Sequence, residues 1–133
     1  MTRVVVDTNV VLRFLTEAPP EHFRRASALF KSAEQGKIEI VMSVLVLAEA
    51  WAVLVHSMNK TPTEASEGLS NVMRLRGVEA EDSDNVLTAL DATSPRIDFV
   101  DAYTALRAQQ LNLPVASFDR DFPKRLGARV HPL

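Results

Sequence analysis

Short apolar runs rich in β-branched residues alternate with amphipathic helical patterns along the chain, and this alternation restricts the fold more than any other feature. Strands are expected at residues 3–6, 37–42, 78–80, 114–117 and 129–131. No repeat or low-complexity linker interrupts the order. It therefore favours an α/β fold with a central, mainly parallel sheet of about five strands and helices on both faces. A chain of 133 residues fits one domain, residues 1–133.

Helix boundaries carry recognisable start and stop signals. Pro20 and Gly36 enclose one amphipathic pattern, as Pro near a helix start and Gly past its end do. Ser43 is placed to cap an apolar helix over residues 44–57. Thr61 and Glu64 form a capping-box pattern for the next helix. Further helices are expected from residue 83 or 84, over 98–111 and, as a short turn, over 122–126.

Composition excludes several classes of protein. The chain has no cysteine, so disulfide frameworks, thiolate zinc sites and cysteine nucleophiles are excluded. No stretch approaches the roughly 20 apolar residues of a membrane-spanning helix, and a cytoplasmic location is expected. A net charge of −2 gives no overall electrostatic signature of nucleic-acid binding. The three histidines are isolated in the sequence, which disfavours zinc.

Two aspartates directly follow expected strands. Asp7 comes after a run of three valines, and Asp119 follows the apolar run that ends near Phe118. In a parallel sheet, ligands bind beyond the carboxyl ends of the strands, so polar residues there are candidate site residues. The alternative is that each aspartate is only a turn or cap residue.

Glu49 lies inside an otherwise apolar helix. Every other residue from 44 to 55 is uncharged, and glutamate is rarely buried without a partner. We expect a positive group to face Glu49. The alternative is a narrow solvent-facing stripe on this helix.

Asp98 and Asp101 stand three residues apart at a helix start. Asp98 is readily explained as an N-cap, and the helix dipole stabilises the negative charge of Asp101 in the first turn. Ala105 and Ala108 follow Asp101 at helical spacing and allow close packing, which should leave Asp101 partly desolvated. We expect Asp101 to share one rim of the sheet with the two aspartates that follow strands.

Four carboxylates meeting without counter-charge would repel one another. Mg²⁺ or Mn²⁺ removes this difficulty, because these cations take oxygen ligands. The sequence therefore predicts a divalent-cation site made from Asp7, Glu49, Asp101 and Asp119.

The order of these motifs resembles that of the PIN-domain ribonucleases, and most closely the VapC-like toxins of bacterial toxin–antitoxin pairs. The resemblance rests on Val-Asp7-Thr-Asn9, Leu-Ala-Glu49-Ala, Asp98-Phe-Val-Asp101-Ala and Ser117-Phe-Asp119-Arg-Asp121. It covers essentially the whole chain. The family usually has Thr at the position of Ser117 and a polar residue at that of Phe118.

The resemblance implies a Mg²⁺- or Mn²⁺-dependent endoribonuclease with those four acidic residues as catalytic and metal-binding groups. It also implies supporting roles for Asn9, Asp98, Ser117 and Asp121. Similar toxins form homodimers and are blocked by a VapB-like antitoxin.

Metal-activated water could then hydrolyse an RNA phosphodiester bond. RNA binding needs cations, and those nearest the carboxylates in sequence are Arg13, Arg120, Lys124 and Arg125. Two alternatives remain. One is a non-catalytic binding module of the same fold. The other is a phosphoacceptor signalling domain, which Glu49 within a helix disfavours.

Overall fold

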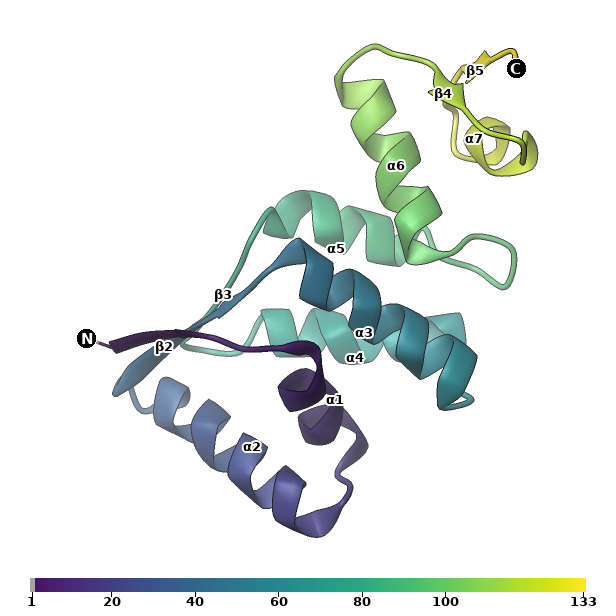
Figure 1. The fold of residues 1–133 in the computed structure, drawn as a ribbon. Coiled ribbons are helices and arrows are strands. Elements are labelled where there is room, and N and C mark those ends of the chain that lie inside the picture. Colours follow the sequence, from purple (N-terminus) through teal and green to yellow (C-terminus); the bar gives the residue numbers. More distant parts are fainter. Residues whose placement is uncertain (1) are drawn as a thin grey trace.

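The computed structural model describes residues 2–133. Strands and helices alternate along these residues as expected (Figure 1). Their order is β1 (Thr2–Val5), α1 (Thr8–Thr16), α2 (Pro20–Glu34), β2 (Ile38–Met42), α3 (Val44–Ser57), α4 (Pro62–Met73), β3 (Val78–Ala80), α5 (Ser83–Asp91), α6 (Phe99–Gln110), β4 (Val115–Ala116), α7 (Asp121–Arg125) and β5 (Val130–His131).

Local hydrogen bonds account for the helix starts. The Ser43 hydroxyl accepts from the N–H of Val46 at 3.2 Å and caps α3. Thr61 and Glu64 form the full capping box of α4, as the sequence predicts. Helix α1 was not predicted. It follows β1 after only Val6 and Asp7, and the Asp7 carboxylate caps it.

The main sheet is parallel and has three strands in the order β1-β2-β3. Val4, Ile40 and Val78 lie side by side on one face. Both crossovers, α1–α2 and α3–α4, run in the same direction across the sheet, so right-handed connections place all four helices on that face. The opposite face carries the exposed side chains of Val5 and of Arg3, which pairs with Glu39 and Glu79.

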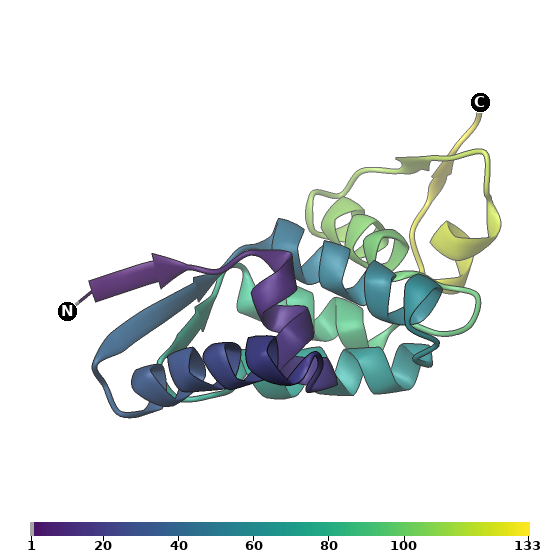
Figure 2. The same ribbon diagram turned by 60° about the horizontal axis from the view of Figure 1, so that its bottom comes forward.

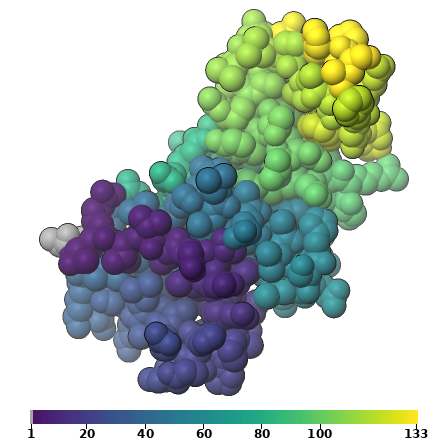
Figure 3. Space-filling model, in the orientation of Figure 1, coloured from purple at the N-terminus to yellow at the C-terminus, as the bar shows by residue number. Residues whose placement is uncertain are grey.

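The last two strands form a separate parallel sheet, β4-β5. A small apolar cluster of Ala105, Val115, Phe122 and Ala128 lies beneath it, apart from the main core. Figures 1 and 2 show this C-terminal lobe beyond α6, on the far side of the molecule from β1, and Figure 3 shows the two lobes. The α/β class and the parallel strands are confirmed. The expectations of one sheet of about five strands and of helices on both faces are wrong for this chain, because β4 follows a helix that leads away from β1.

Helix α3 crosses the centre of the main core. Leu47, Ala50, Trp51 and Leu54 are all at most 3% exposed. The Trp51 indole N–H donates to the Ser66 hydroxyl at 3.0 Å, which lies 2.7 Å from the Thr93 hydroxyl. This polar chain ties α3 to α4 and to the end of α5. Among residues 2–133, no helix is both long and apolar enough to cross a membrane.

Candidate functional site

Asp7 stands between β1 and α1. Its carboxylate accepts from the Val10 N–H at 3.2 Å, so it satisfies one of the free N–H groups at the start of α1. The cap role considered for this residue is therefore confirmed. The side chain is exposed and retains lone pairs that could bind a cation. Asn9, two residues after Asp7 in the first turn of α1, is also exposed.

Glu49 is exposed on α3. No ion pair joins it to a basic residue of the 2–133 segment, so the expected positive partner is absent there. Leu45, one helical turn earlier, is 81% exposed. The alternative of a solvent-facing stripe is therefore correct for this structure, and the stripe continues to the exposed His56.

Asp101 lies in the first turn of α6 and is half-buried, as its packing face predicts. Burial raises the pKa of this carboxyl, and the charges of Asp98 and Asp119 raise the pKa further. A cation at this position would relieve the desolvation and the repulsion together. Asp98 occupies the N-cap position without a side-chain cap bond. Its carboxylate instead lies 3.4 Å from Nε2 of His56, a residue that looked isolated in the sequence.

Asp119 follows β4 in a loop held by its own side chains. The Asp119 N–H donates to the Ser117 hydroxyl at 3.1 Å, and the Asp119 carboxylate accepts from the Asp121 N–H at 2.9 Å. The Ser117 hydroxyl thus holds the backbone of this loop, and its supporting role at a metal site stays a prediction. Phe118 is 96% exposed between them.

The expected common rim does not form within one chain. Asp7 follows a strand of the main sheet, whereas Asp119 follows a strand of the separate one. Across residues 2–133, no three His, Cys, Asp or Glu side chains are close enough together to hold a metal ion. The donor chemistry suits Mg²⁺ or Mn²⁺, since all four candidate ligands are carboxylates, but the described part of a single chain does not gather them.

A hollow of about 470 Å³ adjoins Asp7 between α1 and α2. Arg13, His22 and Arg25 line its polar part, while Val10, Ala26 and Leu29 supply an apolar wall. Of these three residues, the sequence predicts only Arg13 as a phosphate contact. The i, i+3 spacing of His22 and Arg25 on a helix that packs against α1 was the available signal. Two cations and an apolar wall beside a carboxylate suit a nucleotide.

The other predicted phosphate contacts lie on the C-terminal lobe. Arg120 directly follows Asp119, and Lys124 and Arg125 stand in the last turn of α7. Arg125 lies 3.8 Å from Asp121. The C-terminal lobe therefore carries Asp119 with these cations, and the main lobe carries Asp7 with Arg13 in one hollow, so each lobe has both carboxylates and cations.

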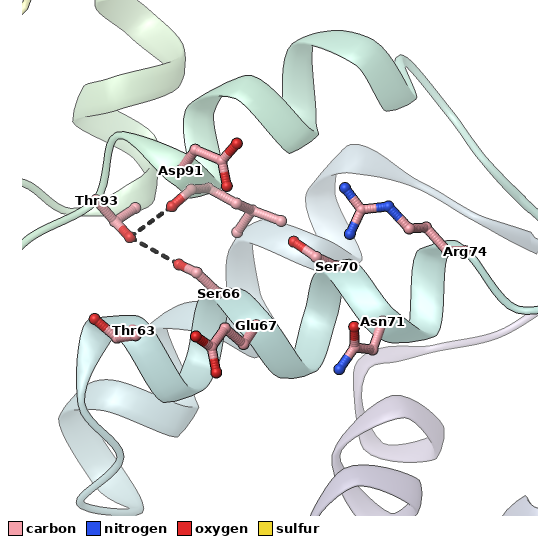
Figure 4. A pocket seen from close by; sticks show the side chains of 9 residues that line it. Thr63, Ser66, Glu67, Ser70, Asn71, Arg74, Asp91 and Thr93 are labelled. Carbon is pink, nitrogen blue, oxygen red and sulfur yellow. Dashed lines mark hydrogen bonds between the residues drawn. The ribbon is translucent and has the colours of Figure 1, made fainter.

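A second hollow, of about 230 Å³, lies between α4 and α5 (Figure 4). Ser66, Glu67, Arg74, Asp91 and Thr93 are among its lining residues. None of the four candidate carboxylates borders it, so it is separate from the predicted site.

The fold and these side chains describe an α/β domain with carboxylates after its strands and cations beside them, an arrangement suited to phosphate chemistry. The family model of the PIN domain matches residues 4–126, and the chain belongs to this family. PIN domains are generally metal-dependent nucleases that act on nucleic acid. No curated protein matches the chain significantly.

Proposed function

We propose that this protein is a Mg²⁺- or Mn²⁺-dependent endoribonuclease of the VapC-like toxin type. The observation that carries the proposal is the match to the PIN domain over residues 4–126, together with the positions of the acidic residues inside it. Asp7 follows β1, Asp119 follows β4, and Asp101 lies half-buried in the first turn of α6. Asp7, Glu49, Asp101 and Asp119 are the proposed ligands.

The cation, when bound, would supply a water of lowered pKa and neutralise charge on the scissile phosphate. Arg13 and Arg25 bind flanking phosphates, and the apolar wall of their hollow packs against a base. A carboxylate of the site orients the water and accepts its proton. The water oxygen bonds to phosphorus, the bond to the leaving ribose oxygen breaks, and that oxygen takes up a proton.

This reaction does not use the ribose 2′-hydroxyl as the nucleophile. No 2′,3′-cyclic phosphate therefore forms, and a substrate with one 2′-deoxy nucleotide at the cut position is still hydrolysed. Both properties separate the proposed activity from that of metal-independent ribonucleases in a preparation.

A second candidate is a non-catalytic RNA-binding module of the same fold. It is favoured by one observation, that three metal-binding side chains do not meet anywhere in residues 2–133 of a single chain. Incubation with labelled RNA separates the two. The nuclease cuts with Mg²⁺ and stops with EDTA, whereas a binding module retains the RNA uncut under both conditions.

The toxin assignment adds further proposals. We expect a homodimer, a location in the cytoplasm, and inhibition by a VapB-like antitoxin. Expression of the wild-type chain should arrest growth, and expression of Asp7→Asn should not. Normal growth with well-expressed, active wild-type protein would contradict the toxin role while leaving the nuclease proposal intact.

A further inference from the structure

The outer edge of β1 is open for hydrogen bonding. Within residues 2–133, β1 has a partner only on its β2 side. The Val6 N–H donates to the Val41 carbonyl on that side, and successive residues of a strand alternate, so the backbone groups of Arg3 and Val5 point outward. Val5 is 74% exposed. An exposed parallel edge with an apolar side chain is a site for strand addition.

β4 offers the matching edge. The Val115 N–H donates to the Arg129 carbonyl of the β5 side at 2.8 Å, so the N–H and C=O of Ala116 point away from β5. A separate sheet of two strands is marginally stable unless it gains a further partner. β4 is thus an open edge that would gain from pairing.

The chain's own β4 is held away from its own β1. Phe99 anchors the start of α6 in the main core at 1% exposure. The Tyr103 hydroxyl donates to Asp82 just before α5, and the Gln110 amide donates to Asn85 of α5 at 2.6 Å. These contacts fix the direction of α6 along its length. Figures 1 and 2 both show β4 and β1 at opposite ends of the molecule.

We propose that β1 of one chain pairs in parallel with β4 of a second copy. The two copies exchange strands reciprocally, which gives a closed, two-fold dimer. Each half then contains a five-stranded parallel sheet in the order β3-β2-β1-β4-β5, with the last two strands from the other copy. The exchange needs no contact of α6 to break.

The side-chain faces of the two sheets agree with this pairing. In a parallel pair, a residue whose backbone hydrogen-bonds to the neighbouring strand lies opposite a residue whose backbone hydrogen-bonds away from it, as Val4 of β1 and Ile40 of β2 do. The backbone of Val5 would hydrogen-bond to β4, and that of Val115 bonds away, to β5. Val5 would therefore lie opposite Val115 or Ser117. Val115 packs with Phe122 of α7, so α7 would lie over the open face that carries Val5.

The handedness of the connections independently places α7 on the same face of the joined sheet. From β4 to β5, the chain would cross the joined sheet in the direction opposite to that from β1 to β3. A right-handed crossover then puts α7 on the face away from α1–α4. That face is the open one, where Val5 is exposed.

The exchange also completes the site, and this step rests on the proposed function. Asp119 follows β4 and would enter the joined sheet with it. The Gln109 side chain of α6 donates to the Leu126 carbonyl just after α7, which keeps α6, the helix that carries Asp101, attached to the C-terminal lobe. Asp101 and Asp119 of one copy would then meet Asp7 and Glu49 of the other at the joined edge. Each site of the dimer is built from both copies.

Cross-linking tests the pairing without using activity, because the chain has no native cysteine. A tagged Val5→Cys chain and an untagged Ser117→Cys chain are co-expressed and treated with a short bismaleimide. We expect a covalent heterodimer, since neighbouring strands lie about 4.8 Å apart. The matched control pairs Val5→Cys with Glu34→Cys at the exposed end of α2, and should not cross-link.

Two results would overturn the proposal. One is a cross-link that forms within a Val5→Cys/Ser117→Cys double variant and never between chains, which would show that β4 pairs with its own β1. The other is the absence of any cross-link. Val5→Pro is a second, independent test. It removes only a backbone N–H that points away from β2, so a free edge tolerates it, whereas pairing with β4 would lose that hydrogen bond. It should convert the dimer to a monomer of 14.7 kDa, and Val5→Ala should not.

Complementation tests the shared site. Asp7→Asn and Asp119→Asn chains with different tags are co-expressed, and the heterodimer is isolated through both tags. One of its two sites has all four carboxylates, so it should cut RNA at about half the wild-type rate, whereas each variant alone is inactive. An inactive heterodimer beside an active wild type refutes the exchange. An inactive wild type refutes the proposed function, and the cross-link still decides the pairing.

Discussion

Asp7 has two separable roles, which a pair of substitutions distinguishes. Its carboxylate caps α1 through the Val10 N–H and is also a proposed cation ligand. Asp7→Asn keeps a cap acceptor and removes the charge, whereas Asp7→Ala removes both. An N-cap hydrogen bond is worth about 1 kcal/mol, so in EDTA the alanine variant should be less stable than the asparagine variant by about that amount. With a urea slope of about 1.5 kcal/mol/M, the midpoints differ by about 0.7 M.

The same unfolding experiment with Mg²⁺ measures the second role. At tenfold excess over its dissociation constant, a cation that binds only the folded protein adds about 1.4 kcal/mol to the free energy of unfolding. The wild type should gain this stability, and both variants should lose most of the gain. Equal stability of the two variants in EDTA would refute the cap. An asparagine variant that gains as much as the wild type in Mg²⁺ would refute Asp7 as a ligand.

Three further predictions concern other parts of the chain. The pKa of Asp101 is raised above 3.8, so its ionisation costs stability, and this cost appears as the pH rises through the raised pKa. Asp101→Asn should therefore be more stable than the wild type at neutral pH without metal, with no difference below pH 3.8; equal urea midpoints at neutral pH would contradict this. Trp51→Phe removes the donor to Ser66 and should lower the free energy of unfolding by about 1 to 2 kcal/mol, and a change below a few tenths would show that the bond is unimportant. Arg25→Ala should weaken RNA binding and reduce its salt slope by about 1, whereas Arg24→Ala, whose side chain pairs with Glu21, should leave the slope unchanged.

The local features were predictable because short-range chemistry determines them. Ser43 and the Thr61–Glu64 capping box predict the starts of their helices, and the structure confirms both. Helix α1 was missed because Val10 and Val11 are β-branched and follow a strand closely. The signal for this helix is the Asp7 side chain, whose role as a cap is the alternative to its role as a ligand.

The strand partners were not predictable to the same degree. Apolar periodicity shows that residues 115–116 form a strand but carries no information on which edge they join. The direction of α6 depends on contacts such as Tyr103 with Asp82, between residues whose pairing the sequence does not reveal. The prediction of a common rim for the carboxylates assumed that β1 and β4 belong to one sheet. The two strands lie in separate sheets, so the carboxylates do not share a rim within one chain. The predicted burial of Asp101 depended only on its own helix face, and it was correct.

Cleavage of one end-labelled RNA against Mn²⁺ concentration tests the central claim most directly, with wild type and Asp7→Asn measured in parallel. The account predicts a wild-type rate that rises with Mn²⁺ to saturation and vanishes in EDTA. A folded Asp7→Asn protein should show no cleavage at any Mn²⁺ concentration. Full cleavage by that variant, or wild-type cleavage that persists in EDTA, would contradict a nuclease site built on these carboxylates.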